Sequence, residues 1–240
     1  MSDRAVIQKI ITGTARSVLR PLGLSQKGRS RIWYDDRGWS LTVVEFQPGS
    51  SPGTYLNVGA MWLWADRAFW AFDYGGRTSW RNDVTFTWRP LDGEAGWQQR
   101  VGFLNADQFS REMALVARVA ALQVQKLRQQ FPDAAAVCDE LTNSSAQMGE
   151  SPLWHAFHGG AAAALSGDLP AAKQNLETVA SADLHFEWQH ELAAQAVGLL
   201  QLMHDPAALR TRVAETIACS RRLLGLPAVT AGSEADDSAR

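Results

Sequence analysis

Residues 39–64 decide the fold, and they read WSLTVVEFQPGSSPGTYLNVGAMWLW. Two stretches rich in β-branched and aromatic residues, Trp39 to Gln47 and Tyr55 to Trp64, flank a loop whose prolines, glycines and serines favour a turn. They are predicted to form two antiparallel strands. A third strand, Ser30 to Asp35, is expected before them, across a short hairpin loop in which Gly38 adopts the left-handed conformation.

The register of the two main strands follows if Gln47 lies opposite Tyr55, because Glu45 then faces Asn57 and directly opposed residues share a face. One face of the sheet is then apolar, with Val44, Phe46, Leu56, Val58, Ala60 and Trp62. The other face is apolar at one end and polar near the loop. Its apolar residues are Trp39, Leu41, Met61 and Leu63, and its polar residues are Glu45, Gln47, Tyr55 and Asn57.

Helical periodicity dominates the rest of the chain. An amphipathic helix from Asp3 to Arg20, which ends at Pro21, is expected to cover the apolar face of the sheet. Two further strands are predicted at 83–89 and 98–104. Further helices are predicted at 107–131, 133–141, 153–165, 170–180, 184–203 and 206–224. The sequence therefore predicts an α+β fold in which an N-terminal helix packs on a Trp-rich antiparallel sheet and a C-terminal helical region follows.

Three parts of the chain are expected from this pattern. Residues 1–148 form the sheet with its helices, residues 149–228 form a bundle of helical hairpins, and residues 229–240 form a disordered acidic tail. A linker is expected at 143–149.

The composition indicates a globular protein and argues against some kinds of partner. A chain of 240 residues with 46% hydrophobic and 20% charged residues is ordinary for a globular protein. The formal net charge of -2 argues against a nucleic-acid binder, which usually carries a basic excess. The charge is uneven, since residues 1–100 carry 13 Lys and Arg against 9 Asp and Glu, whereas the remainder carries 10 against 16. We expect no membrane partner, because no long apolar run is present.

The two cysteines, Cys138 and Cys219, are far apart and form no Cys-x-x-Cys pair, so neither a disulfide framework nor a zinc ribbon is indicated. Thiols in apolar surroundings suit a reducing compartment. The N-terminal segment is amphipathic rather than continuously apolar, which does not resemble a secretory signal. A cytoplasmic location is expected.

Several short motifs are similar to those of the bacterial domain-of-unknown-function 4304 family over roughly residues 5–145. They are the sequence LRPLGL at 19–24, KGR at 27–29, IWY at 32–34, VVEFQ at 43–47 and YLNVG at 55–59. The resemblance implies a helix followed by an aromatic antiparallel sheet, and it implies no particular activity. A weaker likeness to a single tetratricopeptide-type helical hairpin covers residues 154–180, where alanines at 161–164 allow close helix packing before a Gly-Asp turn.

Signatures of catalysis are missing from the sequence. No Gly-x-Ser-x-Gly elbow and no phosphate-binding glycine loop occur, so no catalytic residue and no cofactor is assigned. The five histidines all lie between His155 and His204. Because His185 and His190 are five positions apart and fall on different faces of a helix, the spacing favours structural or surface histidines over a metal site.

Tryptophan is the outstanding feature of the composition. Eight of the ten tryptophans lie between Trp33 and Trp97. Aromatic side chains are favoured both in strand packing and at protein interfaces, so at least half are expected in the core and an exposed minority on a binding face. The candidate binding surface comprises Glu45, Gln47, Tyr55, Asn57, Trp62 and Trp64.

Two functions stay open. The leading hypothesis is a non-enzymatic cytoplasmic module that binds a protein partner, as an immunity or accessory protein of a bacterial toxin or operon system. The alternative is a small hydrolase or ligand-binding enzyme with a polar pocket at the end of the second and third strands. A concave pocket that contains the four polar residues would favour the enzyme, and an apolar patch with exposed tryptophan would favour the binding module. The oligomeric state is not predicted.

Overall fold

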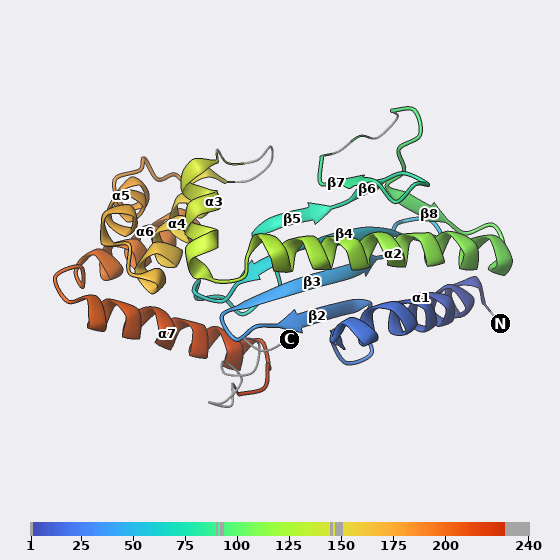
Figure 1. Ribbon diagram of the computed structural model, residues 1–240, viewed down its shortest axis with the longest axis horizontal. Helices are drawn as coiled ribbons and strands as arrows, with labels where there is room; N and C mark the ends of the chain where they lie inside the picture. The colour runs from blue at the N-terminus through green and yellow to red at the C-terminus, as the bar shows by residue number, and fades with distance from the viewer. Residues whose placement is uncertain (1, 90, 92–93, 145, 147–150, 229–240) are drawn as a thin grey trace.

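The computed structural model describes residues 2–89, 91, 94–144, 146 and 151–228 (Figure 1). It confirms the α+β class, with two long helices against an antiparallel sheet and a group of helices beside one end of that sheet. The predicted tail at 229–240 lies outside the described residues, as does most of the predicted linker at 143–149. No helix in the described part of the chain is long and apolar enough to cross a membrane.

The main sheet is antiparallel throughout, in the order β1-β2-β3-β4-β5, and β8 pairs with the start of β4. The predicted register is confirmed, since Gln47 pairs with Tyr55, Glu45 with Asn57 and Val43 with Gly59. The strands of this sheet are β1 (Ser25–Gln26), β2 (Ile32–Asp36), β3 (Ser40–Gln47), β4 (Gly53–Trp62), β5 (Tyr74–Arg77) and β8 (Arg100–Gly102). A separate hairpin consists of β6 (Ser79–Trp80) and β7 (Phe86–Thr87).

Some of the strand predictions were wrong in extent. The strands expected at 83–89 and 98–104 are only two and three residues long, as β7 and β8, and β1, β5 and β6 were not predicted. Strand β5 escaped detection because Gly75 and Gly76 suggest a turn in the sequence. At Gly75, φ is +80° and a Cβ atom would lie 2.7 Å from the carbonyl oxygen of Val58, so only glycine lets β5 approach β4 this closely.

The seven α-helices of the described residues have ends close to those predicted. Asp and Asn side chains accept backbone N–H groups at the first turns of α2, α3, α5 and α7, which explains where these helices begin. The helices are α1 (Asp3–Leu19), α2 (Ala106–Gln130), α3 (Ala134–Asn143), α4 (Pro152–Ser166), α5 (Leu169–Ala180), α6 (Glu187–Leu200) and α7 (Pro206–Leu223), and the short 3-10 turn η1 (Arg20–Leu22) follows α1. The hairpin expected at 154–180 is present as α4 and α5, which turn at Gly167.

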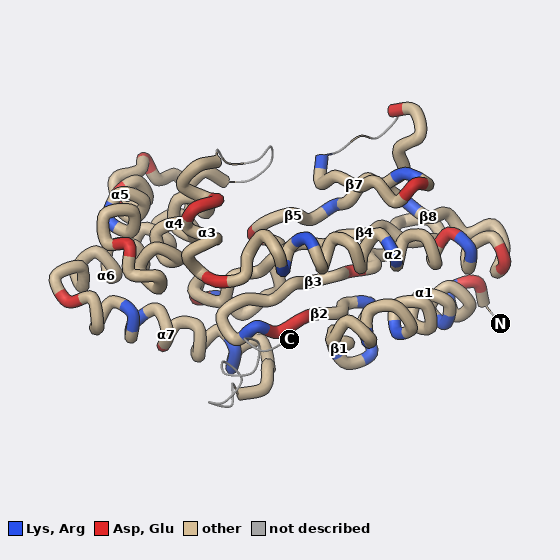
Figure 2. The backbone as a smooth tube through the Cα atoms, viewed as in Figure 1, with Lys and Arg blue, Asp and Glu red and all other residues tan. Residues whose placement is uncertain are grey.

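Charged residues are unevenly distributed along the backbone (Figure 2). Lys and Arg outnumber acidic residues along α1, which contains Arg4, Lys9 and Arg16 but only one acidic residue, Asp3. Helix α1 therefore gives the N-terminal half much of its basic character.

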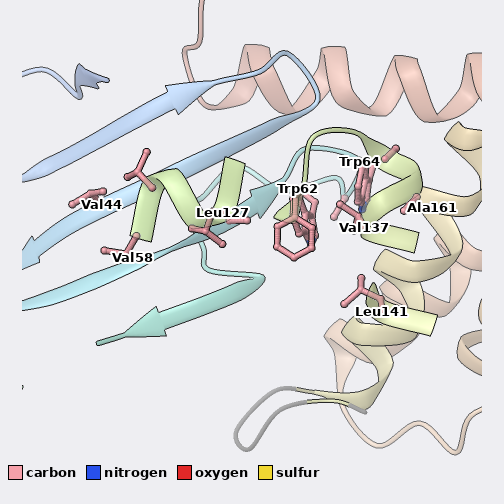
Figure 3. Close-up of a cluster of buried hydrophobic side chains, with 14 of the residues drawn as sticks. Val44, Val58, Trp62, Trp64, Leu127, Val137, Leu141 and Ala161 are labelled. Carbon is pink, nitrogen blue, oxygen red and sulfur yellow. The ribbon is translucent and has the colours of Figure 1, made fainter. Parts of the chain in front are cut away.

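One hydrophobic core runs through both halves of the molecule (Figure 3). The apolar face of the sheet is covered by α1, as expected, and also by α2, which contacts β3 and β4. The same core continues past the end of the sheet into the helical region, where Trp62 and Trp64 lie close to α3 and α4. The sheet and the helices are therefore joined by continuous apolar packing.

Candidate functional site

The second face of the sheet is divided into a covered end and a polar end. At the covered end, Leu41, Val43, Met61 and Leu63 pack against Trp70 and Phe72 and against side chains at the C-terminal end of α7 and just beyond it. At the other end lie the four polar residues predicted from the register, Glu45, Gln47, Tyr55 and Asn57. Asn57 is buried and the other three are half-buried.

Hydrogen bonds join these polar side chains to one another. The Nδ2 group of Asn57 donates to Glu45 Oε2 at 2.8 Å and to Gln47 Oε1 at 3.0 Å. Glu45, Gln47 and Asn57 therefore lie together on one face, as the predicted register requires, whereas their role as a binding surface stays a prediction.

Arg77 on β5 completes the group and was missed by the sequence analysis. Its Nε donates to Asn57 Oδ1 at 2.8 Å and its Nη2 donates to Gln47 Oε1 at 2.6 Å. The guanidinium carbon lies 4.0 Å from the centre of the Tyr55 ring, which is a cation–π contact. The polar cluster is defined as Glu45, Gln47, Tyr55, Asn57 and Arg77, and its members are joined by hydrogen bonds and by the cation–π contact of Tyr55.

The placement of Trp62 and Trp64 on a binding surface is corrected by the structure. Only 1% of Trp62 and 2% of Trp64 is exposed. Their rings stack with centres 5.5 Å apart, and Trp39 stacks on both. They are buried because they continue the apolar face of the sheet to the point where α3 and α4 close over it, and burying such rings is strongly favourable.

Trp39 also differs from its predicted position beside Leu41. It precedes β3, so the alternation of a strand does not apply to it, and its ring lies against Trp62 on the helix-covered side.

A buried polar network connects the residues that follow β4 to His158 on α4. Trp64 donates its Nε1–H to Nδ1 of His158 at 3.1 Å, and His158 Nε2 lies 3.4 Å from Asp73 Oδ1. Asp73 forms an ion pair with Arg67 and accepts the backbone N–H of Trp62 at 2.7 Å. Because an indole N–H only donates, Nδ1 of His158 is the acceptor, and the ring proton is assigned to Nε2, which faces Asp73.

The charge on Asp73 is stabilised within this network. Burial by itself raises the pKa of the Asp73 carboxyl group, but contacts with His158 and Arg67 outweigh it, so the pKa lies well below its usual range. The side chains of Arg67, Asp73 and His158 are only 7%, 5% and 1% exposed. The sequence analysis did not predict this network. Arg67 and Asp73 lie in the loop between β4 and β5, where no periodic pattern indicates their contacts.

The histidines form no metal centre within the described ranges. There, no three or more His, Cys, Asp or Glu side chains are grouped so that they could hold a metal ion. His155 Nε2 lies 2.8 Å from the carbonyl oxygen of Leu141, and His185 lies 3.5 Å from the carboxylate of Asp183.

Exposed aromatic side chains gather where the loop between β4 and β5 meets α4 and α6. The aromatic surface, defined as Phe69, Trp154 and Trp188, has Phe69 at 61% and Trp188 at 37% exposure, while Trp154 is half-buried. The rings of Trp154 and Trp188 are stacked with centres 6.3 Å apart. The Arg67 guanidinium lies 5.2 Å from the Trp154 ring and 5.9 Å from that of Phe69, which connects the three.

Among the hollows formed by the described residues, two lie between helices. One, of about 280 Å³, lies between α4, α6 and α7 next to Asp66 and Gln195, and has Phe157, Leu199 and Val213 among its lining residues. The other is a shallow groove between α1 and α2. Neither contains a residue of the polar cluster.

Comparisons of the chain with models of protein families, with curated proteins and with solved structures give no match. The resemblance to the domain-of-unknown-function 4304 family therefore stays a prediction.

Proposed function

We propose that this chain is a non-enzymatic cytoplasmic binding module, and that it holds a protein partner on its aromatic surface. The observation that supports this most directly is the exposure of Phe69 and Trp188 around a preformed stack. An immunity or accessory role in a bacterial system is the setting that we propose for such a module.

Exposed aromatic side chains can supply a large part of the binding energy of an interface. Trp and Arg are enriched among residues that carry the binding energy of interfaces, and covering them with a partner removes apolar area from water. Trp188 is already stacked on Trp154, and Arg67 is already paired with Asp73. Association therefore orders few additional side chains, which lowers the entropic cost of binding.

The alternative, a small hydrolase or ligand-binding enzyme at the polar cluster, has less support. The donors and acceptors of Gln47, Asn57 and Arg77 are bound to one another, so a ligand would have to displace these contacts.

Capture from bacterial cells tests the proposal. Tagged wild-type chain is compared with a Phe69→Ala/Trp188→Ala variant, and the retained proteins are quantified by mass spectrometry. The matched control is Leu104→Ala, because Leu104 is 81% exposed and lies between β8 and α2, outside the aromatic surface. Circular dichroism first establishes that all three chains are folded.

We expect at least one protein to be retained by the wild type and the control but lost from the double variant. An identical set of retained proteins for all three chains would contradict the proposal.

A further inference from the structure

Carboxylates border the aromatic surface. On α6, Glu187 and Glu191 flank Trp188 and are exposed, and Glu191 lies one turn beyond Trp188 on the same face. Gln195 follows one turn later and accepts the backbone N–H of Asp66 at 3.4 Å. Asp66, also exposed, therefore lies at the other edge of this stretch of α6.

The cations nearby are already engaged. Arg67 is paired with Asp73, Arg212 lies 3.7 Å from Glu215, and His185 contacts Asp183. In the described part of the chain, Asp66, Glu187 and Glu191 have no ion pair with Lys or Arg. The border of the aromatic surface is thus negatively charged.

A cavity with a mixed lining, in which Arg212 and Thr216 stand beside apolar side chains, opens next to the same border. The 280 Å³ hollow is lined by Asp66 and Gln195 and also by Phe157, Leu199 and Val213. Gly198 is also part of the lining, and no heavy atom lies within 4 Å of the place where its Cβ would be. A single apolar side chain from a partner would find a preformed place here.

From these observations we infer that the partner presents a basic segment, in which Lys or Arg side chains flank an apolar residue. The apolar residue enters the cavity, while the cations lie against Asp66, Glu187 and Glu191 and over the rings of Phe69 and Trp188. This inference rests on the proposed function and adds the chemistry of the partner. The basic residues of α1 make a second copy of this chain the competing occupant (Figure 2).

Two synthetic helical peptides of about 16 residues test the inference. They share one leucine stripe and carry either Lys or Glu at every outward position. Binding of each fluorescent peptide to the full chain is measured by anisotropy at about 50 mM and about 300 mM salt. The proteins compared are the wild type, Asp66→Asn/Glu187→Gln/Glu191→Gln, and a control with three other exposed acids neutralised, Glu94→Gln/Asp107→Asn/Glu177→Gln.

We expect the Lys peptide to bind the wild type and the control at least about tenfold more tightly than the Glu peptide at low salt. Neutralising Asp66, Glu187 and Glu191, or raising the salt concentration, should weaken binding by about fivefold or more. Equal binding of the two peptides, absence of binding, or an unaffected neutralised variant would overturn the inference.

Two further outcomes separate the claims. If the charge inference fails but Phe69→Ala/Trp188→Ala still loses a captured protein, the proposed function survives with a partner of different chemistry. If sedimentation equilibrium shows that the chain alone associates, and that neutralising the three acids abolishes the association, the occupant is a second copy and the inference of a different basic partner is overturned.

Discussion

Trp64 and His158, which are 94 positions apart in the chain, are joined by a buried hydrogen bond of 3.1 Å from the indole Nε1–H to the imidazole Nδ1. The bond connects the residues just after β4 to α4. Trp154 stacks on the His158 ring with centres 5.3 Å apart, so the buried network reaches the aromatic surface. The geometry of the exposed rings thus depends on the packing between sheet and helices.

Replacement of His158 by alanine should be strongly destabilising. The change leaves the Trp64 N–H group without an acceptor in a buried site, so we expect the free energy of unfolding to fall by about 2–4 kcal/mol. Urea unfolding followed by circular dichroism measures this. His185→Ala is the control, because His185 is exposed, and its effect should stay within about 0.5 kcal/mol. Equal losses for the two variants would show that the network contributes little.

Replacement of Asp73 by asparagine should leave Arg67 buried without its counter-ion, at a cost of about 3–5 kcal/mol near neutral pH. The folded pKa of Asp73 is lower than its unfolded value of about 3.9, so the unfolded chain takes up this proton first on acidification. The stabilisation by Asp73 is therefore complete above that unfolded value and declines as the pH falls below it.

Unfolding of the wild type and Asp73→Asn across the range from about pH 6 to about pH 3 checks this dependence. The difference in unfolding free energy should narrow toward the acidic end. A constant difference would mean that the Asp73 carboxylate does not contribute through its charge.

Truncation should destabilise the chain far more at Trp62 than at Trp188. Trp62→Ala removes a buried ring from the stack with Trp39 and Trp64, so a loss of stability of about 3–5 kcal/mol is expected. Trp188→Ala should change stability by less than about 1 kcal/mol, because the ring is exposed. Thermal and urea unfolding of both variants decide the matter, and a larger effect at Trp188 would contradict the assignment of the core.

The polar cluster should behave as a coupled unit. Arg77→Met keeps apolar contact with Tyr55 but loses the hydrogen bonds to Asn57 and Gln47, which should cost about 1–2 kcal/mol. A double-mutant cycle with Gln47→Ala should give a coupling energy of at least about 0.5 kcal/mol. Strictly additive effects would show that the two side chains do not act together.

Two glycine substitutions of the same kind should have opposite signs. Gly75→Ala forces a Cβ to within 2.7 Å of the Val58 carbonyl oxygen at φ +80°, so a loss of about 2 kcal/mol or more is expected. Gly13→Ala, inside α1 with no heavy atom within 4 Å of the new Cβ, should stabilise the chain by about 0.5–1 kcal/mol. Urea midpoints measure both, and a tolerated Gly75→Ala would contradict the close approach of β5 to β4.

The sequence by itself determined the register of β3 and β4 and the faces of their side chains. Those features depend on an alternation of period two and on the turn between the strands, both of which are local. For the same reason the polar residues Glu45, Gln47, Tyr55 and Asn57 were correctly placed together. The starts of helices were also determined by nearby residues, since Asn105 and Asp133 cap the helices that follow them.

Only the tertiary structure decided which aromatic rings are buried and which polar groups meet. Trp62 is buried because α3 and α4 close over the end of the sheet, and no periodicity near residue 62 encodes that contact. Arg77 reaches Asn57 through the pairing of β5 with β4, and His158 meets Trp64 and Asp73 across the junction between sheet and helices. Contacts between distant segments arise from the packing of whole elements, whereas a sequence pattern reports only the surroundings that each segment requires.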